Sequence, residues 1–476
     1  MLFHSLDYFY FLALALGVFW VLWRQRWLRL AVLLAASCVF YMAWRPEYIL
    51  LIGGSTVLDF IVGHQIHVTE DPRKRKAWLG LSLLGNLGLL FAFKYYNFFA
   101  GELTEGLQGW GFDASLPLLE AALPVGISFY TFQTLSYTID IYRRRLEPTS
   151  SFVEFACFVT YFPQLVAGPI VRATELLPQL QRAPQLSPDK ASKGLFLIAT
   201  GLIKKVAIAD LLATSLVDRV FEQPELFTAT EVVVALYAFT MQLYCDFSGY
   251  TDVARGSAML FGLELPENFD RPYQATSPAE FWRRWHMTLS RWLRDYLYFP
   301  LGGSRVGPVR AYVNLFITMF LVGIWHGWWA NFEVFFWYAL LQAGAMTLHR
   351  FAFKRSGRRR DAVDDWPVRA LKIFANLQFV VFSRILFRAT SMENAEAVTD
   401  RLFSQTVSTA QVNLTVWLLL AATFVAHYLP RRVFLTFEQT FVKLPAVMQG
   451  VVLAIVAMLL SLVATAEAVP FIYFQF

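Results

Sequence analysis

Apolar runs separated by short polar connections extend along nearly the whole chain. The clearest runs in the first third of the sequence lie near 8–23, 28–43, 48–64, 78–96 and 123–142. A helix needs about 20 mostly apolar residues to cross a bilayer, and these runs approach that length. The pattern therefore predicts an all-α polytopic membrane protein with about 11–12 transmembrane helices, together with re-entrant or interfacial helices.

Three stretches interrupt this pattern. The glycine-rich segment 97–122 is expected to lie outside the membrane, on its outer side. Residues 152–170 are apolar but contain two prolines and a glycine, so we expect a re-entrant segment or a bent helix that lines a cavity. In the run DFSGYTDVARG, Asp246 and Asp252 flank Gly249, which indicates a loop or a broken helix.

Composition supports the membrane assignment and gives an orientation. Hydrophobic residues make up 57% of the chain and charged residues only 16%, whereas soluble domains carry about 25% charged residues. The net charge of +6 reflects basic loops such as 73–76 and 143–145, which the positive-inside rule assigns to the cytoplasm. This rule places the N-terminus and the C-terminal tail outside. The basic loops are thus interpreted as topology signals, and no nucleic acid partner is expected. The first helix lacks a cleavage site and is expected to be retained.

Several common kinds of site have no signature here. Cys38, Cys157 and Cys245 show no paired spacing, so neither a disulfide framework nor a zinc site is indicated. The chain also lacks a P-loop, a dinucleotide fingerprint and a zinc-binding His/Glu helix. No matched pair of interrupted segments, of the kind found in transporters, occurs in the two halves. We expect one membrane domain over 1–476 with no metal and no bound cofactor.

The segment FWRRWHMTLSRWLRDYLY at 281–298 contains the first of two candidate histidines. Ser277, followed by a proline and then by Glu280, predicts an N-cap before a single amphipathic helix. On that helix His286 falls within the apolar sector and away from the arginines, so its ring should point into the protein. The pattern alone favours a structural explanation over a catalytic one, either an imidazole hydrogen-bonded within the core or an aromatic-rich helix in the membrane interface.

His326 is the second candidate and follows a nearly unbroken apolar run. Ionisable groups at membrane depth are costly and usually face a cavity or a partner. The flanking Gly323 and Gly327 would allow another backbone or a ligand to approach closely. A neutral histidine in this position could act as a general base, although an interfacial histidine at a helix end is the alternative.

Other charges in apolar surroundings allow two interpretations. Lys204, Lys205 and Asp210 lie in an expected helix at 194–213. A structural ion pair with snorkelling lysines is favoured there over a site for donor phosphates. The two carboxylates at 246–252 could serve acid/base chemistry or could simply be turn residues.

Taken together, these runs resemble the membrane-bound O-acyltransferase (MBOAT) family, in its bacterial AlgI-like branch. The resemblance covers the chain from the first helix to the last residue, with a signature core at about 123–330. It rests on LPVGISFYTFQTLSYTIDIYR at 123–143, FPQLVAGPI at 162–170, KKVAIAD at 204–210, LYCDFSGYTDVARG at 243–256, ENFDRPY at 267–273, EFWRRWHMTLSRWLRDYLY at 280–298, LGGSR at 301–305, GIWHG at 323–327 and PFIYFQF at the C-terminus.

The resemblance implies that His326 is catalytic and that His286 is the second signature histidine. Residues expected to line the substrate path are Asp246, Asp252, Asn268, Arg271, Trp282, Arg283, Arg284 and Trp325. The implied acyl donor is acetyl-CoA, and the implied final acceptor is a polysaccharide such as alginate. The implied location is a bacterial inner membrane. The acetyl group would reach the polysaccharide through a periplasmic SGNH-type acetyltransferase or another extracytoplasmic acceptor protein. Membrane lipid is the other expected partner. Peptidoglycan O-acetylation, teichoic-acid D-alanylation and, in a different class, a transporter or channel are the alternatives.

Overall fold

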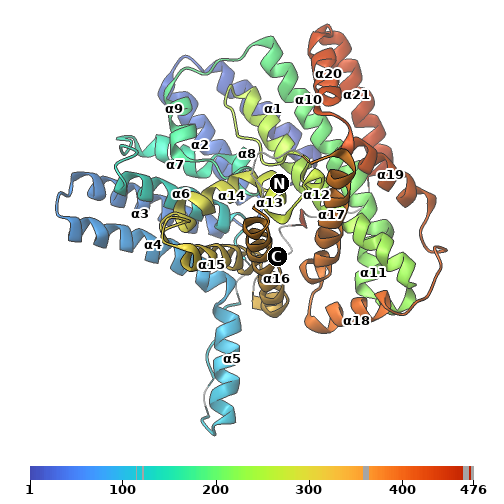
Figure 1. Cartoon of the computed structure of the whole chain (residues 1–476). Coiled ribbons are helices and arrows are strands. Elements are labelled where there is room, and N and C mark those ends of the chain that lie inside the picture. The colour runs from blue at the N-terminus through green and yellow to red at the C-terminus, as the bar shows by residue number, and fades with distance from the viewer. Residues whose placement is uncertain (114, 121–122, 328, 358–363, 465–470, 473–476) are drawn as a thin grey trace. The chain divides into compact units, whose positions relative to one another are not determined.

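The computed structural model describes residues 1–113, 115–120, 123–327, 329–357, 364–464 and 471–472 (Figure 1). Within these ranges every regular element is a helix, which confirms the all-α class. The chain divides into two compact units, each built from separate stretches of sequence. Unit 1 comprises Met1–Leu202, Tyr250–Pro266 and Glu438–Val456, and unit 2 comprises Ile203–Gly249, Glu267–Phe437 and Ala457–Phe476. The single membrane domain over 1–476 stays a prediction.

Unit 1 holds the N-terminal helices. In chain order they are α1 (Leu6–Val21), α2 (Arg26–Met42), η1 (Pro46–Tyr48), α3 (Ile49–Val68), α4 (Pro72–Lys94), α5 (Tyr96–Gly109), α6 (Ile127–Tyr142), α7 (Phe152–Thr160), α8 (Phe162–Leu165), α9 (Ala173–Gln181) and α10 (Pro188–Leu202). Helices α3, α4 and α6 pack side by side (Figure 1). Buried Asp59 on α3 accepts hydrogen bonds from Ser82 at 2.6 Å and Asn86 at 2.7 Å, both on α4, so polar groups as well as apolar surface join these helices.

Unit 2 contains both candidate histidines. Its elements are the π-helices η2 (Ile203–Asp210) and η3 (Ala213–Val217), then α11 (Asp218–Glu222), η4 (Pro224–Leu226), η5 (Pro272–Gln274), α13 (Pro278–Arg284), α14 (Met287–Leu293), the π-helix η6 (Arg294–Tyr298), α15 (Pro308–His326), η7 (Trp329–Asn331), α16 (Phe332–Arg355), α17 (Trp366–Arg388), α18 (Met392–Leu402) and α19 (Leu414–Tyr428). Helices α15 and α16 form a hairpin, and α17 packs on α16. Three helices run from one unit into the other: α12 (Ala229–Leu260), α20 (Arg431–Lys443) and α21 (Ala446–Val463).

Six helices in the described ranges are long and apolar enough to cross a membrane, or seven if the bent pair α19 and α20 counts as one span. The six spans are Pro46–Val68, Pro72–Lys94, Ala229–Leu260, Pro308–His326, Trp366–Arg388 and Ala446–Val463. This number is below the expected 11–12 because other apolar segments are short or interrupted: α1, for example, has only 16 residues. The polytopic membrane character predicted from the sequence is confirmed.

The expected loop or broken helix at 246–256 is wrong, because α12 continues through it without interruption. Gly256 serves helix packing instead of a turn. A Cβ atom added to Gly256 would lie 2.4 Å from the backbone oxygen of Gly194 on α10 and 2.8 Å from a side-chain carbon of Ile198. Gly256 therefore allows α10 and α12 to approach closely, a role that a single sequence cannot distinguish from a turn signal.

The other interruptions have mixed outcomes. The segment 97–122 contains the helix α5, which extends away from α4 (Figure 1). Its position outside the membrane stays a prediction, and positions 114 and 121–122 lie outside the described residues. The bend expected within 152–170 is confirmed, because α7 and α8 are separated at Tyr161, whose backbone is not helical. The helix expected at 194–213 begins earlier, as α10, and widens into the π-helix η2.

Candidate active site

His286 lies at a break between two short helices in unit 2. The first helix, α13, begins as predicted, because the Ser277 hydroxyl accepts a hydrogen bond from the N–H of Glu280 at 3.2 Å. The second, α14, starts directly after His286, whose φ of +44° is left-handed. The single continuous helix predicted over 281–298 is therefore wrong. The prediction that His286 points inward is confirmed, since its exposed fraction is 0%.

Backbone hydrogen bonds to a distant segment cause this break. The N–H of Asp270 donates to the carbonyl of Arg284 at 2.9 Å, and the N–H of Met287 donates to the carbonyl of Asn268 at 2.9 Å. In a continuous helix this carbonyl and this amide would instead pair within the helix. The bonds hold His286 in a conformation that is uncommon for a residue with a side chain, and such conformations cluster at functional sites.

Asn268 fixes the tautomer of His286. Its Oδ1 accepts hydrogen bonds from the backbone N–H of Thr288 at 3.2 Å and from the Thr288 hydroxyl at 2.8 Å, and it lies 3.2 Å from Nδ1 of His286. A backbone N–H can only donate, so the Asn268 atom facing these groups is the oxygen. Nδ1 of His286 must then donate its proton to that oxygen. The lone pair of the neutral ring is consequently on Nε2.

The surroundings of His286 keep the ring neutral. Phe247 meets it edge-on, with ring centroids 4.9 Å apart. Burial lowers the pKa of His286 to about 3, because an imidazolium ion would have to leave water for apolar surroundings. At physiological pH the residue is therefore a hydrogen-bond acceptor through Nε2 and not a cation.

His326 is the last residue of α15 and is 4% exposed. Its ring lies 4.8 Å from that of Trp325 and 5.7 Å from that of Phe387, in edge-on contacts. A Cβ atom on Gly323 would lie 2.4 Å from the backbone of Ala339 on α16. The close approach expected at this glycine is therefore made by another helix, and it fixes the end of α15 that holds His326.

The two histidine segments share neighbours in unit 2. The guanidinium carbon of Arg384, on α17, lies 5.2 Å from the ring centroid of Trp285 and 5.2 Å from that of Phe387. Trp285 immediately precedes His286, and Phe387 contacts His326. Arg384 and its two aromatic neighbours thus connect the segments that carry the two histidines.

The predicted lining tryptophans are both largely buried. Trp282 is 7% exposed, and its Nε1 donates to the side-chain oxygen of Gln342 on α16 at 3.4 Å. Trp325 is 9% exposed and lies against His326. Trp325 therefore contacts the second histidine, whereas Trp282 links α13 to α16, and substrate binding stays a prediction for both.

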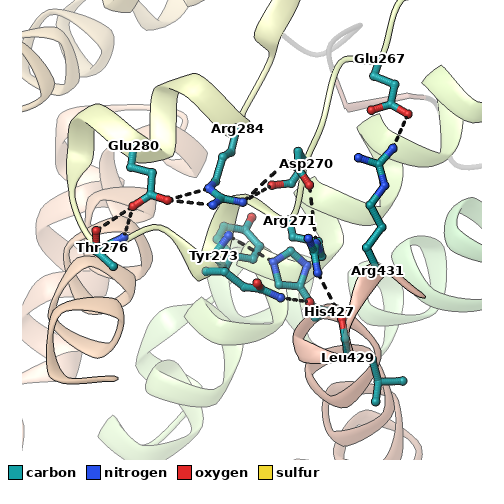
Figure 2. Close-up of polar contacts among 11 residues, drawn as sticks. Glu267, Asp270, Arg271, Tyr273, Thr276, Glu280, Arg284, His427, Leu429 and Arg431 are labelled. Carbon is teal, nitrogen blue, oxygen red and sulfur yellow. Dashed lines mark hydrogen bonds and ion pairs between the residues drawn. The ribbon is translucent and has the colours of Figure 1, made fainter. Parts of the chain in front are cut away.

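The predicted cations Arg271 and Arg284 lie in a separate ion network (Figure 2). Arg284 binds Glu280 at 2.8 Å and Asp270 at 3.5 Å. Arg271 lies 3.5 Å from Asp270 and donates to the backbone carbonyl of Leu429 at 3.4 Å. Figure 2 shows these side chains grouped around the loop that precedes α13. Neighbouring carboxylates thus offset both charges, and a role in substrate binding stays a prediction.

Buried Asp246 belongs to another ion network. Lys205 on η2 binds Asp246 at 2.8 Å and Asp210 at 2.7 Å, and the backbone N–H of Ile472 donates to Asp246 at 2.8 Å. The structural ion pair favoured for Lys205 and Asp210 is confirmed. Because the carboxylate of Asp246 is occupied by these contacts, its geometry indicates a structural role.

The last two predicted lining residues are Asp252 and Arg283, and their role in binding stays a prediction. Asp252 is in the part of α12 that belongs to unit 1, with Arg255 3.9 Å away, and Arg283 is exposed on α13. Across the described ranges, no group of three or more His, Cys, Asp or Glu side chains is placed to hold a metal ion.

Comparison with known proteins identifies the family. The model of the membrane-bound O-acyltransferase family, MBOAT, matches residues 142–383. The chain is also 39% identical over 399 residues to "Probable alginate O-acetylase AlgI" of Pseudomonas aeruginosa, covering 83% of this chain and 73% of that protein. This chain belongs to the MBOAT family. It is therefore an acyltransferase, and the transporter alternative is set aside.

Two further relatives show the range of reactions around this MBOAT protein. The peptidoglycan O-acetyltransferase of Helicobacter pylori is 35% identical over 389 residues, which is 76% of this chain and 71% of that protein. The teichoic acid D-alanyltransferase of Bacillus subtilis is 26% identical over 275 residues, 55% of this chain and 68% of that protein. The three named relatives all transfer acyl groups, but their names give different products.

Sequence reasoning did not find Arg384 in this MBOAT chain. The residue lies one position beyond the region that the family model matches. Its signal was nevertheless present, because LQFVVFSRILF is an apolar run with one cation in the middle, and an ionisable residue inside an apolar span marks a functional candidate.

Proposed function

We propose that this protein is an O-acetyltransferase that takes acetyl groups from acetyl-CoA and delivers them to hydroxyl groups of an extracytoplasmic polysaccharide. The observation that carries the proposal is the pair of buried histidines in unit 2, of which His286 is held neutral with its lone pair on Nε2. The 39% identity to an alginate O-acetylase supports acetyl as the acyl group.

His326 is the proposed general base. It removes the proton from the acceptor hydroxyl while the hydroxyl oxygen attacks the thioester carbonyl carbon. A C–O bond forms and the carbonyl oxygen takes the π electron pair. When the C–S bond breaks, the leaving thiolate takes the proton from the imidazolium, giving the O-acetyl ester and free CoA. His326 ends α15, and the negative end of the helix dipole stabilises the transient positive charge there.

His286 has a different proposed role. A neutral ring can accept a hydrogen bond from the substrate through its lone pair and so orient the substrate, but it does not readily take up a proton. We assign it to orienting the thioester arm or the acceptor hydroxyl beside His326. The hydrogen bond from Nδ1 to Asn268 supports this role because it fixes the direction of Nε2.

The proposed location is a bacterial inner membrane, with the donor bound from the cytoplasm and the N-terminus and tail outside. The basic loops of unit 1 support this orientation through the positive-inside rule. Acetyl groups then reach the polymer directly or through a periplasmic SGNH-type acetyltransferase. The favoured polymer is alginate or a similar exopolysaccharide. Peptidoglycan is the second candidate, because the identity to a peptidoglycan O-acetyltransferase is 35% over a similar share of the chain.

The experiment uses the full chain in proteoliposomes, with acetyl-CoA labelled on its acetyl group. Release of free CoA is followed with alginate oligosaccharide, with peptidoglycan fragments and without acceptor, each in the presence and absence of a candidate periplasmic acetyltransferase. Label on the alginate oligosaccharide supports the proposal, and label on peptidoglycan alone moves the function to the second candidate. Consumption of D-alanyl donors but not of acetyl-CoA would contradict acetyl transfer.

A further inference from the structure

Arg384 is a buried cation inside a helix that can span the membrane. It lies on α17 and is 2% exposed, among the largest fully buried side chains described. Its guanidinium group faces the rings of Trp285 and Phe387, and it interacts electrostatically with the phenol groups of Tyr273 and Tyr338. All five residues belong to unit 2.

No carboxylate among the described residues forms an ion pair with this guanidinium, and its Nε and Nη2 have no hydrogen-bond partner there. Arg388 provides the comparison one helical turn later, because it binds Asp218 at 2.8 Å. Burying a charge without an opposite charge costs several kcal/mol, and an intramembrane cation normally faces a partner. No described residue supplies this opposite charge, which makes a bound substrate group a candidate source of it.

The position of Arg384 indicates which group of the substrate supplies the negative charge. Its guanidinium packs on the ring before His286 and on the ring that contacts His326. Negative charge develops beside these histidines only when the acceptor oxygen adds to the acyl carbonyl. A cation placed in advance at that point acts in surroundings of low polarity, where it stabilises charge far more than it would in water.

We propose that Arg384 stabilises the oxyanion formed on the acyl carbonyl oxygen during acetyl transfer. The inference rests on the proposed function. As the C–O bond forms, the π electron pair moves onto the carbonyl oxygen, which accepts hydrogen bonds from Nε and Nη2 of Arg384. When the pair returns, the C–S bond breaks and the thiolate leaves with the proton held by His326. Arg384 gains and loses no atom.

The diphosphate and the 3′-phosphate of CoA are the other anionic oxygen groups of the donor, and the site fits them less well. A diphosphate carries at least two negative charges, whereas this site offers one guanidinium enclosed by aromatic rings. Its second charge would be buried without compensation. A single developing charge matches the single cation and the two unused N–H groups.

The test compares Arg384→Gln and Arg384→Lys with the control Arg388→Gln, which removes the same charge from the same helix at a site paired with Asp218. Each full-length protein is assayed in proteoliposomes with acetyl-CoA and with S-acetylpantetheine, which keeps the thioester but has no phosphate. Melting temperature and elution volume in detergent establish that each variant is folded. Arg384→Lys keeps a cation at the site, and it is the variant compared with the wild type if Arg384→Gln does not fold.

We expect Arg384→Gln to lower kcat by about 100-fold or more with little change in KM, by the same factor for both donors. Arg384→Lys should recover part of this loss, and Arg388→Gln should retain wild-type kcat. A folded Arg384→Gln variant with wild-type kcat overturns the inference. A variant that has a higher KM for acetyl-CoA, but an unchanged kcat and an unchanged KM for S-acetylpantetheine, also overturns it, because this result would indicate phosphate binding. If the wild type transfers no acetyl group, the proposed function fails instead.

Discussion

Replacement of Asn268 by alanine tests how His286 is positioned. The side-chain oxygen of Asn268 accepts hydrogen bonds from His286 and from two donors of Thr288 in a fully buried place. One of these bonds caps the first turn of α14. Each buried bond contributes about 1 kcal/mol net, so Asn268→Ala should lower the free energy of unfolding by about 3 kcal/mol. The freed His286 ring would also lose its fixed tautomer, and misplacement of a reacting group can lower kcat on the order of 100-fold.

The assay pairs thermal unfolding in detergent with the rate of CoA release. Asn376→Ala is the matched control, because this asparagine is also buried but its side-chain nitrogen and oxygen have no hydrogen-bond partner among the described residues. We expect little change in either quantity for the control. If Asn268→Ala has the melting temperature and kcat of the wild type, the assignment of Asn268 as the residue that orients His286 is refuted.

Three further predictions follow from buried groups. Because the pKa of His286 is about 3 in the folded protein and 6.5 in the unfolded chain, the unfolded state binds more protons between these values. The free energy of unfolding should therefore fall by about 2 kcal/mol from pH 6.5 to 5, and His286→Gln should flatten this slope in melting curves. Gly323→Ala should lower the melting temperature, since its Cβ would lie 2.4 Å from a neighbouring backbone, whereas Gly344→Ala, with nothing within 4 Å, should leave it equal or higher. Lys205→Met leaves two buried carboxylates without their cation and should cost about 3–5 kcal/mol in denaturant titrations; an unchanged midpoint would contradict the ion-pair assignment.

The sequence predicted correctly those structural features that depend on neighbouring residues. The N-cap at Ser277, the inward direction of His286 and the basic loops all depend on residues that are close together in the chain. Spans could be recognised because apolar length is itself the physical requirement. The pairing of Lys205 with Asp210 was predicted for the same reason, since the two residues are only five positions apart.

The features that sequence reasoning missed depend on distant parts of the chain. The helix breaks at His286 because residues 268–270 take over its backbone hydrogen bonds, and periodicity cannot show that competition. Gly256 was interpreted as part of a loop although it contacts Gly194, which is 62 positions earlier. Arg284 has a local partner in Glu280, four positions earlier on α13, but Asp270, which contacts both Arg271 and Arg284, comes from the preceding loop, whose fold no local pattern indicates. The role of both arginines in the substrate path stays a prediction.

The rate of acetyl transfer by a folded His326→Gln variant tests the central claim most directly. Wild type and variant are compared in proteoliposomes with labelled acetyl-CoA and the acceptor that the wild type uses, after both give the same melting temperature. Loss of a general base lowers a rate by about 10²–10⁴-fold, and we predict a decrease in kcat within that range. A variant that transfers acetyl groups at the wild-type rate would contradict the assignment of His326 as the catalytic base and, with it, this account of the site.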